Sequence, residues 1–275
     1  MISMTYKTWR KAGAVVALTA LAACGGEAGE AGNGAESGEG EGGEASVSAP
    51  PAAAPGAAAP AAGGEAGEAG AVAAYAGLSG DQLIALRVQH LRGFVMAASK
   101  VAGDNQPDEA GVLVAQGILE VYDSAPDQFG ALNIAIIRAA ADPAALNRAQ
   151  RIQRLRDAED EFNRVADTLD ADDAITVARM VDIATGLYQL VIQEDFVDPI
   201  EYQHSMGAAL AARAALAHGE AALRAENLRA YAEARTALTR FTELWPQATA
   251  PTNPTPYREV LAQASRVRLA LSPFL

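Results

Sequence analysis

The feature that most restricts the fold is the spacing of the apolar residues, which recur every three or four positions throughout residues 79–271. In the first such segment, Ile84, Val88, Leu91 and Val95 follow one another at this interval. The period places them on one face of an α-helix, whereas a half-buried strand needs alternating apolar and polar residues. No alternation of useful length occurs, so the sequence predicts an all-α fold.

Start and stop signals divide this region into about eight helices joined by short turns. Ser79 and Gln82 have the spacing of a capping box, which would open the first helix. We expect one or two up-down helical bundles within residues 73–275, divided into 73–170 and 171–275 if there are two. Further helix starts are predicted at Pro107, at Asp142-Pro143, at Asp172-Asp173 (a helix running to about Gln193), at Pro199 and near Tyr257.

Residues 25–70 are almost wholly Gly, Ala, Glu, Pro and Ser, and Val47 is their only large apolar residue. They contain eight glutamates and no basic residue. A chain of this composition cannot bury enough apolar surface to offset the entropy of ordering. We therefore expect residues 24–72 to form a disordered tether.

The first 23 residues have the pattern of an export signal: a basic start with Lys7, Arg10 and Lys11, followed by an apolar run over residues 12–23. At helical rise this run covers roughly 18 Å, which is too short to cross a hydrocarbon core of about 30 Å. The sequence therefore predicts a cleaved signal peptide over residues 1–23 rather than a membrane span.

Leu21-Ala22-Ala23-Cys24 resembles the lipobox of bacterial lipoproteins, and Cys24 is the only cysteine of the chain. The resemblance implies that Cys24 becomes the lipid-bearing first residue of the mature protein and attaches it to a membrane. An aspartate after this cysteine commonly retains lipoproteins at the inner membrane, and here the residue is Gly25. The expected location is the cell envelope, on the periplasmic face of the outer membrane.

The net charge of the whole chain is −13, and residues 71–275 carry 18 basic and 26 acidic side chains. An acidic domain does not suit nucleic acid, which requires basic patches. No phosphate loop, dinucleotide fingerprint, zinc-protease motif or nucleophile elbow occurs. We therefore expect a protein that is not an enzyme.

One short pattern occurs twice, 114 residues apart. Gln89-His90-x-x-Gly93 is repeated as Gln203-His204-x-x-Gly207, and two alanines follow each glycine at the same distance. The repeat has two possible origins, an ancestral duplication of a helical bundle or chance in an alanine-rich chain. The third histidine, His218, precedes a glycine and is typical of a helix C-terminus, where the dipole favours a cation.

The repeated histidines carry one chemical hypothesis, a transition-metal site formed by His90, His204, Glu120 and Glu201. Histidine is the commonest transition-metal ligand, and Glu201 lies three residues before His204, on the same helix face. The alternative interpretation is that the histidines lie at the edge of the core and are satisfied by hydrogen bonds.

The lipobox, the helical periods, the repeat and the segment 197–204 together resemble imelysin-like proteins. The resemblance implies an exported helical protein with two related four-helix bundles and a role in iron or haem uptake. The family's Gly-x-His-x-x-Glu ligand motif is absent, and the nearest stretch, residues 115–120, has Gln116 before Gly117 and no histidine.

Two functions follow from these observations. The first is a lipid-anchored periplasmic helical-bundle binding protein, imelysin-like, whose ligand is a transition-metal ion or an envelope protein. The alternative is a structural or adaptor lipoprotein that docks a cell-envelope protein complex and has no metal site. The separation of His90 and His204 discriminates between them, because a metal binder needs both imidazoles close together.

Overall fold

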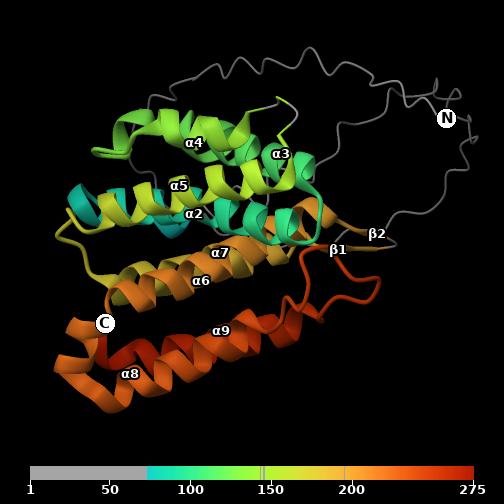
Figure 1. Cartoon of the computed structure of the whole chain (residues 1–275). Helices are drawn as coiled ribbons and strands as arrows, with labels where there is room; N and C mark the ends of the chain where they lie inside the picture. Colours follow the sequence, from blue (N-terminus) through green and yellow to red (C-terminus); the bar gives the residue numbers. More distant parts are fainter. Residues whose placement is uncertain (1–72, 143, 145, 195) are drawn as a thin grey trace, which may run out of the picture. The chain divides into compact units, whose positions relative to one another are not determined.

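The computed structural model describes residues 73–142, 144, 146–194 and 196–275 (Figure 1). The predicted signal peptide, Cys24 and the tether lie outside these residues. The regular structure of the described part is helical except for one hairpin of two-residue strands, so the all-α prediction is confirmed. None of its helices combines the length and the apolar character that crossing a bilayer requires.

The elements follow one another with short connections. In chain order they are α2 (Gly80–Gly103), α3 (Pro107–Gly117), the π-helical turn η1 (Ile118–Tyr122), the 3-10 turn η2 (Pro126–Gln128), α4 (Ile134–Ala141), α5 (Arg148–Ala166), α6 (Asp173–Tyr188), β1 (Ile192–Gln193), β2 (Phe196–Val197), α7 (Pro199–His218), α8 (Glu220–Thr242), α9 (Tyr257–Leu271) and the 3-10 turn η3 (Ser272–Phe274).

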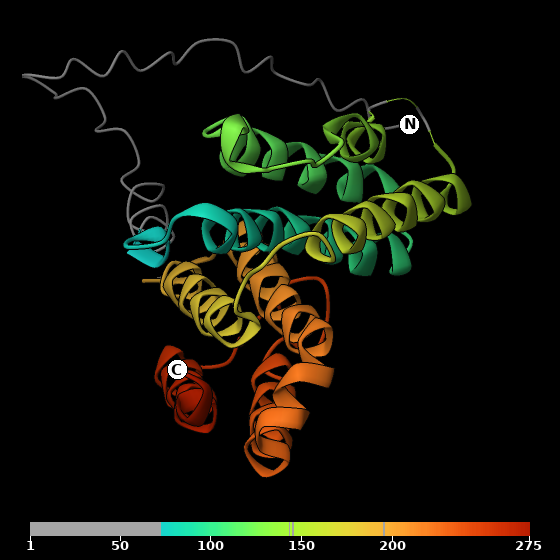
Figure 2. The same ribbon diagram turned by 90° about the vertical axis from the view of Figure 1, so that its left-hand side faces the viewer.

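The helices pack in two rings of four. In the first ring α2 contacts α3, α3 contacts α4, α4 contacts α5, and α5 returns to α2. In the second ring α6, α7, α8 and α9 close in the same way. Figure 1 and Figure 2 show the rings meeting where α2 lies against α6 and α7. One continuous cluster of buried apolar side chains runs through both rings.

Two predicted helix starts, at Asp172-Asp173 and at Pro199, are confirmed, and an aspartate caps each helix. The Asp172 side chain accepts a hydrogen bond from the Ile175 amide at 3.0 Å and opens α6. The Asp198 side chain opens α7 in the same way, accepting from the Ile200 amide at 2.9 Å. The helix predicted to reach Gln193 is shorter than expected, because the antiparallel β1–β2 hairpin follows it.

Two predicted starts were wrong in detail. Ser79 occupies the N-cap position of α2, but its side chain makes no capping hydrogen bond. Gln82 instead joins α2 to the start of α6, because its amide can both donate and accept. Its Oε1 accepts from the Asp172 amide at 2.8 Å, and its Nε2 donates to Thr176 Oγ1 at 2.9 Å.

The long charged helix begins at Arg148 and not at Asp142-Pro143. Asn147 and Gln150 form a reciprocal capping box there, with both hydrogen bonds at 3.0 Å. This box satisfies two of the amides that a helix N-terminus leaves exposed. The earlier aspartate is the C-cap of α4.

Candidate functional site

The repeated motif lies where α2 crosses α7. Gly93 and Gly207 face each other at the crossing, so closely that a Cβ on Gly207 would overlap the carbonyl oxygen of Gly93. A Cβ on Gly93 would lie 2.9 Å from the carbonyl carbon of Gly207. The alanines of both motifs are fully buried beside them. Small residues on both helices therefore allow the two backbones into direct contact.

The position of the motif in the two rings bears on its origin. It lies on the first helix of one ring and on the second helix of the other. A tandem duplication of a four-helix ring would place it on corresponding helices. The close crossing accounts for the glycines and alanines of both copies without a duplication, since each helix needs small residues at the contact.

His90 is buried in α2, with 7% of its surface exposed. Its Nδ1 is hydrogen-bonded to the Tyr75 hydroxyl at 2.5 Å, and the Arg87 guanidinium lies 4.0 Å from the centre of the Tyr75 ring. Burial, with smaller contributions from the nearby His204 and Arg87, lowers the pKa of His90 to about 3. This imidazole is therefore neutral at physiological pH.

His204 lies in α7 and packs against the same Phe94 ring as His90. The ring centres of Phe94 and His204 are 4.6 Å apart, and those of Phe94 and His90 are 5.9 Å apart. Burial lowers the pKa of His204 to about 4, although the charge of Asp198 opposes the shift. Both predicted histidines thus contact the same phenylalanine.

The two predicted glutamates are placed differently. Glu120 belongs to η1, and its Oε2 lies 3.9 Å from His204 Nδ1. Glu201 lies one helical turn before His204, with its Oε2 buried. His204 Nε2 is buried and has no hydrogen-bond partner among the described residues. The structure therefore brings Glu120 to His204, but His90 is held by Tyr75.

No three histidine, cysteine, aspartate or glutamate side chains in the described part of the chain are grouped so that they could hold a metal ion. Neutral imidazoles are the protonation state that a metal requires. The described residues offer His204 with the Glu120 carboxylate 3.9 Å away, and His90 against the same Phe94 ring. A metal site at these residues stays a prediction, without a three-ligand cluster to support it.

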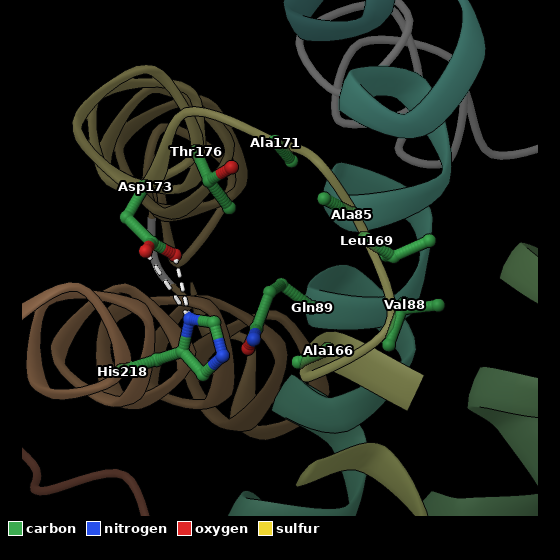
Figure 3. Close-up of a pocket in the computed structure, with 9 residues that line it drawn as sticks. All are labelled: Ala85, Val88, Gln89, Ala166, Leu169, Ala171, Asp173, Thr176 and His218. Atoms are coloured by element: carbon green, nitrogen blue, oxygen red, sulfur yellow. Dashed lines mark hydrogen bonds and ion pairs between the residues drawn. The ribbon is translucent and has the colours of Figure 1, made fainter. Parts of the chain in front are cut away.

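The two glutamines of the repeat have unequal surroundings. Gln203 Nε2 donates to Glu109 Oε1 at 2.8 Å. Gln89 is equally buried, but its Oε1 has no hydrogen-bond partner in the described part of the chain. Figure 3 shows Gln89 beside a small pocket of about 20 Å³ that His218 and Asp173 also line. That volume holds one water and excludes an organic ligand.

His218 forms a polar cluster that the sequence did not indicate. It is the last residue of α7, as predicted for a helix C-terminus. Its Nδ1 lies 3.0 Å from Asp173 Oδ1 (Figure 3). Its Nε2 lies 3.3 Å from Asp167 Oδ1. Burial raises the pKa of Asp173, while the contact with His218 opposes the rise. The cluster joins the ends of α5 and α7 to the start of α6.

Comparison with known proteins does not add a family to this picture. No family model matches the chain, and no curated protein or solved structure matches it either.

Proposed function

We propose that this protein is a non-enzymatic, lipid-anchored adaptor of the cell envelope, whose helical rings bind an envelope protein through their outer surface. The observation that carries the proposal is the use of the histidine motif in packing. His90 and His204 both pack against Phe94, at a crossing so close that both helices need glycine. The motif therefore serves to join the two rings, which leaves the outer helix faces for binding.

The anchor is Cys24, within the lipobox-like segment Leu21-Ala22-Ala23-Cys24. Several acyl chains on one residue would hold the protein firmly at the periplasmic face of the outer membrane. Residues 25–70 would then separate the helical part from the lipid headgroups, by about 35–40 Å if they behave as a flexible chain.

In-cell photo-crosslinking tests the adaptor function. A photoreactive residue at exposed Ala232 of α8 or exposed Arg154 of α5 samples the two rings separately. We expect one discrete envelope protein to be cross-linked from one of these faces. The Cys24→Ser chain is the control, because without the anchor it should lose both fatty-acid labelling and the cross-link. Absence of a discrete cross-link from every exposed position would contradict the adaptor function.

A second candidate function is binding of a transition-metal ion, as the imelysin-like resemblance implies. Its support is the buried His204 Nε2, which has no hydrogen-bond partner among the described residues. If this function holds, a divalent transition metal should raise the unfolding midpoint, because a ligand bound only by the folded state stabilises it. His90→Ala and His204→Ala should then abolish the shift, with His218→Ala as the control that retains it. The adaptor function predicts no metal-dependent shift in the wild type.

A further inference from the structure

Positive charge is concentrated at one end of an otherwise acidic chain. Residues 220–271 carry seven arginines and five glutamates, whereas residues 71–219 carry eleven basic and twenty-one acidic side chains. Residues 220–271 comprise α8 and α9, which pack against each other in the second ring (Figure 1). The net charge of residues 220–271 is therefore +2, whereas that of residues 71–219 is −10.

An open groove of about 410 Å³ runs between these two helices. Three arginines, Arg229, Arg240 and Arg266, and one carboxylate, Glu233, line it; the rest of the lining is Gln263 and the small side chains Ala232, Thr236 and Ala237 of α8. Small residues in the floor allow a polypeptide backbone to come close to the helix. The groove therefore combines three guanidinium groups with space for an extended segment.

One of the three arginines is held in place by a buried amide. Gln263 is 5% exposed, and its Nε2 donates to the Ala237 carbonyl at 2.8 Å. Its Oε1 accepts from Arg266 at 2.9 Å. These two hydrogen bonds of Gln263 connect α8 to α9 and orient the Arg266 guanidinium in the absence of a ligand. Preorganised charge costs less entropy on binding than a free side chain does.

The other two arginines are available to a ligand. Arg240 forms no ion pair among the described residues, and Arg229 pairs only with Glu233, at 2.9 Å and with 90% of the Arg229 side chain exposed. An exposed pair of this kind is weak. The helix also restarts beside Arg229, because Asn227 is non-helical and its Oδ1 accepts from the Ala230 amide. The new helix N-terminus adds positive potential to that end of the groove.

We propose that this groove docks an acidic, extended segment of an envelope protein; this assignment rests on the adaptor function and names its partner chemistry. Arg229 and Arg240 are eleven residues apart, which is about 16 Å along a helix. That spacing suits carboxylates distributed along a peptide, because a single phosphate group could not reach both. An anionic bilayer suits the groove poorly, since a flat surface cannot enter it and residues 71–219 would repel it.

Peptide binding to the intact lipoprotein in non-ionic detergent tests the assignment. The probe is a fluorescent peptide of alternating Glu and Ser, and the control probe has Gln at every Glu. We expect only the Glu peptide to bind, more weakly as salt rises. Arg240→Gln should weaken binding about threefold, and the triple change at Arg229, Arg240 and Arg266 more than about tenfold. Arg258→Gln, an equal charge change elsewhere on α9, should leave binding within about 1.5-fold.

Several results would overturn the assignment. Equal losses from Arg258→Gln and Arg240→Gln would mean that only net charge matters. If inorganic phosphate displaces the peptide when both are present at the same concentration of negative charge, the groove is a site for a single anion. Arginine-dependent binding to phosphatidylglycerol vesicles, without peptide binding, would place a lipid surface there.

The groove and the adaptor function can fail separately. If the cross-linked partner persists in the triple arginine variant, the groove assignment fails and the adaptor function stands. If the Glu peptide binds in an arginine-dependent way but no partner cross-links, the adaptor function fails and the groove remains an acidic-peptide site.

Discussion

The two copies of the Gln-His-x-x-Gly motif have the same burial and the same role in packing, but different polar surroundings. In α2, His90 is hydrogen-bonded to Tyr75, and Gln89 makes no hydrogen bond within the described part of the chain. In α7, His204 lies near a glutamate, and Gln203 is hydrogen-bonded to another. The difference teaches that the pattern specifies a close helix crossing, while the neighbouring elements specify the chemistry of its polar side chains.

The largest effect should come from placing a methyl group in the crossing. Gly207→Ala should lower the free energy of unfolding by about 3 kcal/mol, because the new Cβ meets backbone atoms that cannot move aside. Gly93→Ala should cost about 1–2 kcal/mol, since its contacts are longer. Urea denaturation measures both. Gly103→Ala is the control: nothing lies near its Cβ position, so it should be neutral or slightly stabilising. Equal effects from all three would refute the proposed role of the crossing.

The next effect concerns pH. Each histidine has a folded-state pKa below the usual 6.5, so the unfolded chain takes up the proton first as the pH falls. Stability due to the neutral imidazoles is thus complete above pH 6.5 and is lost at lower pH. Between neutral pH and pH 5, the free energy of unfolding of the wild type should fall by about 2 kcal/mol more than that of His90→Leu. The same difference is expected between the wild type and His204→Leu.

The same measurement compares the two copies. The loss of stability that depends on His204 should stop near pH 4, and the loss that depends on His90 should continue to about pH 3, in line with their folded-state pKa values. Unfolding curves of the wild type and of both leucine variants at each pH provide the comparison. A difference from wild type that stays constant between pH 7 and pH 4.5 would show that the imidazole concerned takes up its proton in the folded state as well.

The smallest effect should separate the two glutamines. Gln203→Leu should cost about 1 kcal/mol, because it removes the hydrogen bond to Glu109. Gln89→Leu should be neutral or stabilise by about 0.5 kcal/mol, because it removes a buried carbonyl that has no hydrogen-bond partner among the described residues. Thermal unfolding of the two single variants decides the matter, and a larger loss for Gln89→Leu would mean that the pocket beside it holds a ligand or water that binds this amide.

Local signals in the sequence predicted much of the fold. Helices α6 and α7 begin where Asp172-Asp173 and Pro199 predicted, because a helix start depends on residues only a few positions away. The helix start predicted at Asp142-Pro143 was wrong, because the capping box that opens this helix is formed five residues later, at Asn147. The hairpin after α6 was missed, because two paired residues on each strand leave no alternation to detect.

The sequence by itself determined an all-α fold, the repeated small-residue motif and the concentration of arginine in residues 220–271, since all of these are properties of neighbouring or periodic residues. Only the tertiary structure decided which side chains meet. Tyr75 reaches His90 across 15 residues, Glu120 approaches His204, and His218 joins Asp173 across 45 residues. These pairings depend on how whole helices cross, and a crossing is the sum of many weak packing contacts that no local pattern encodes.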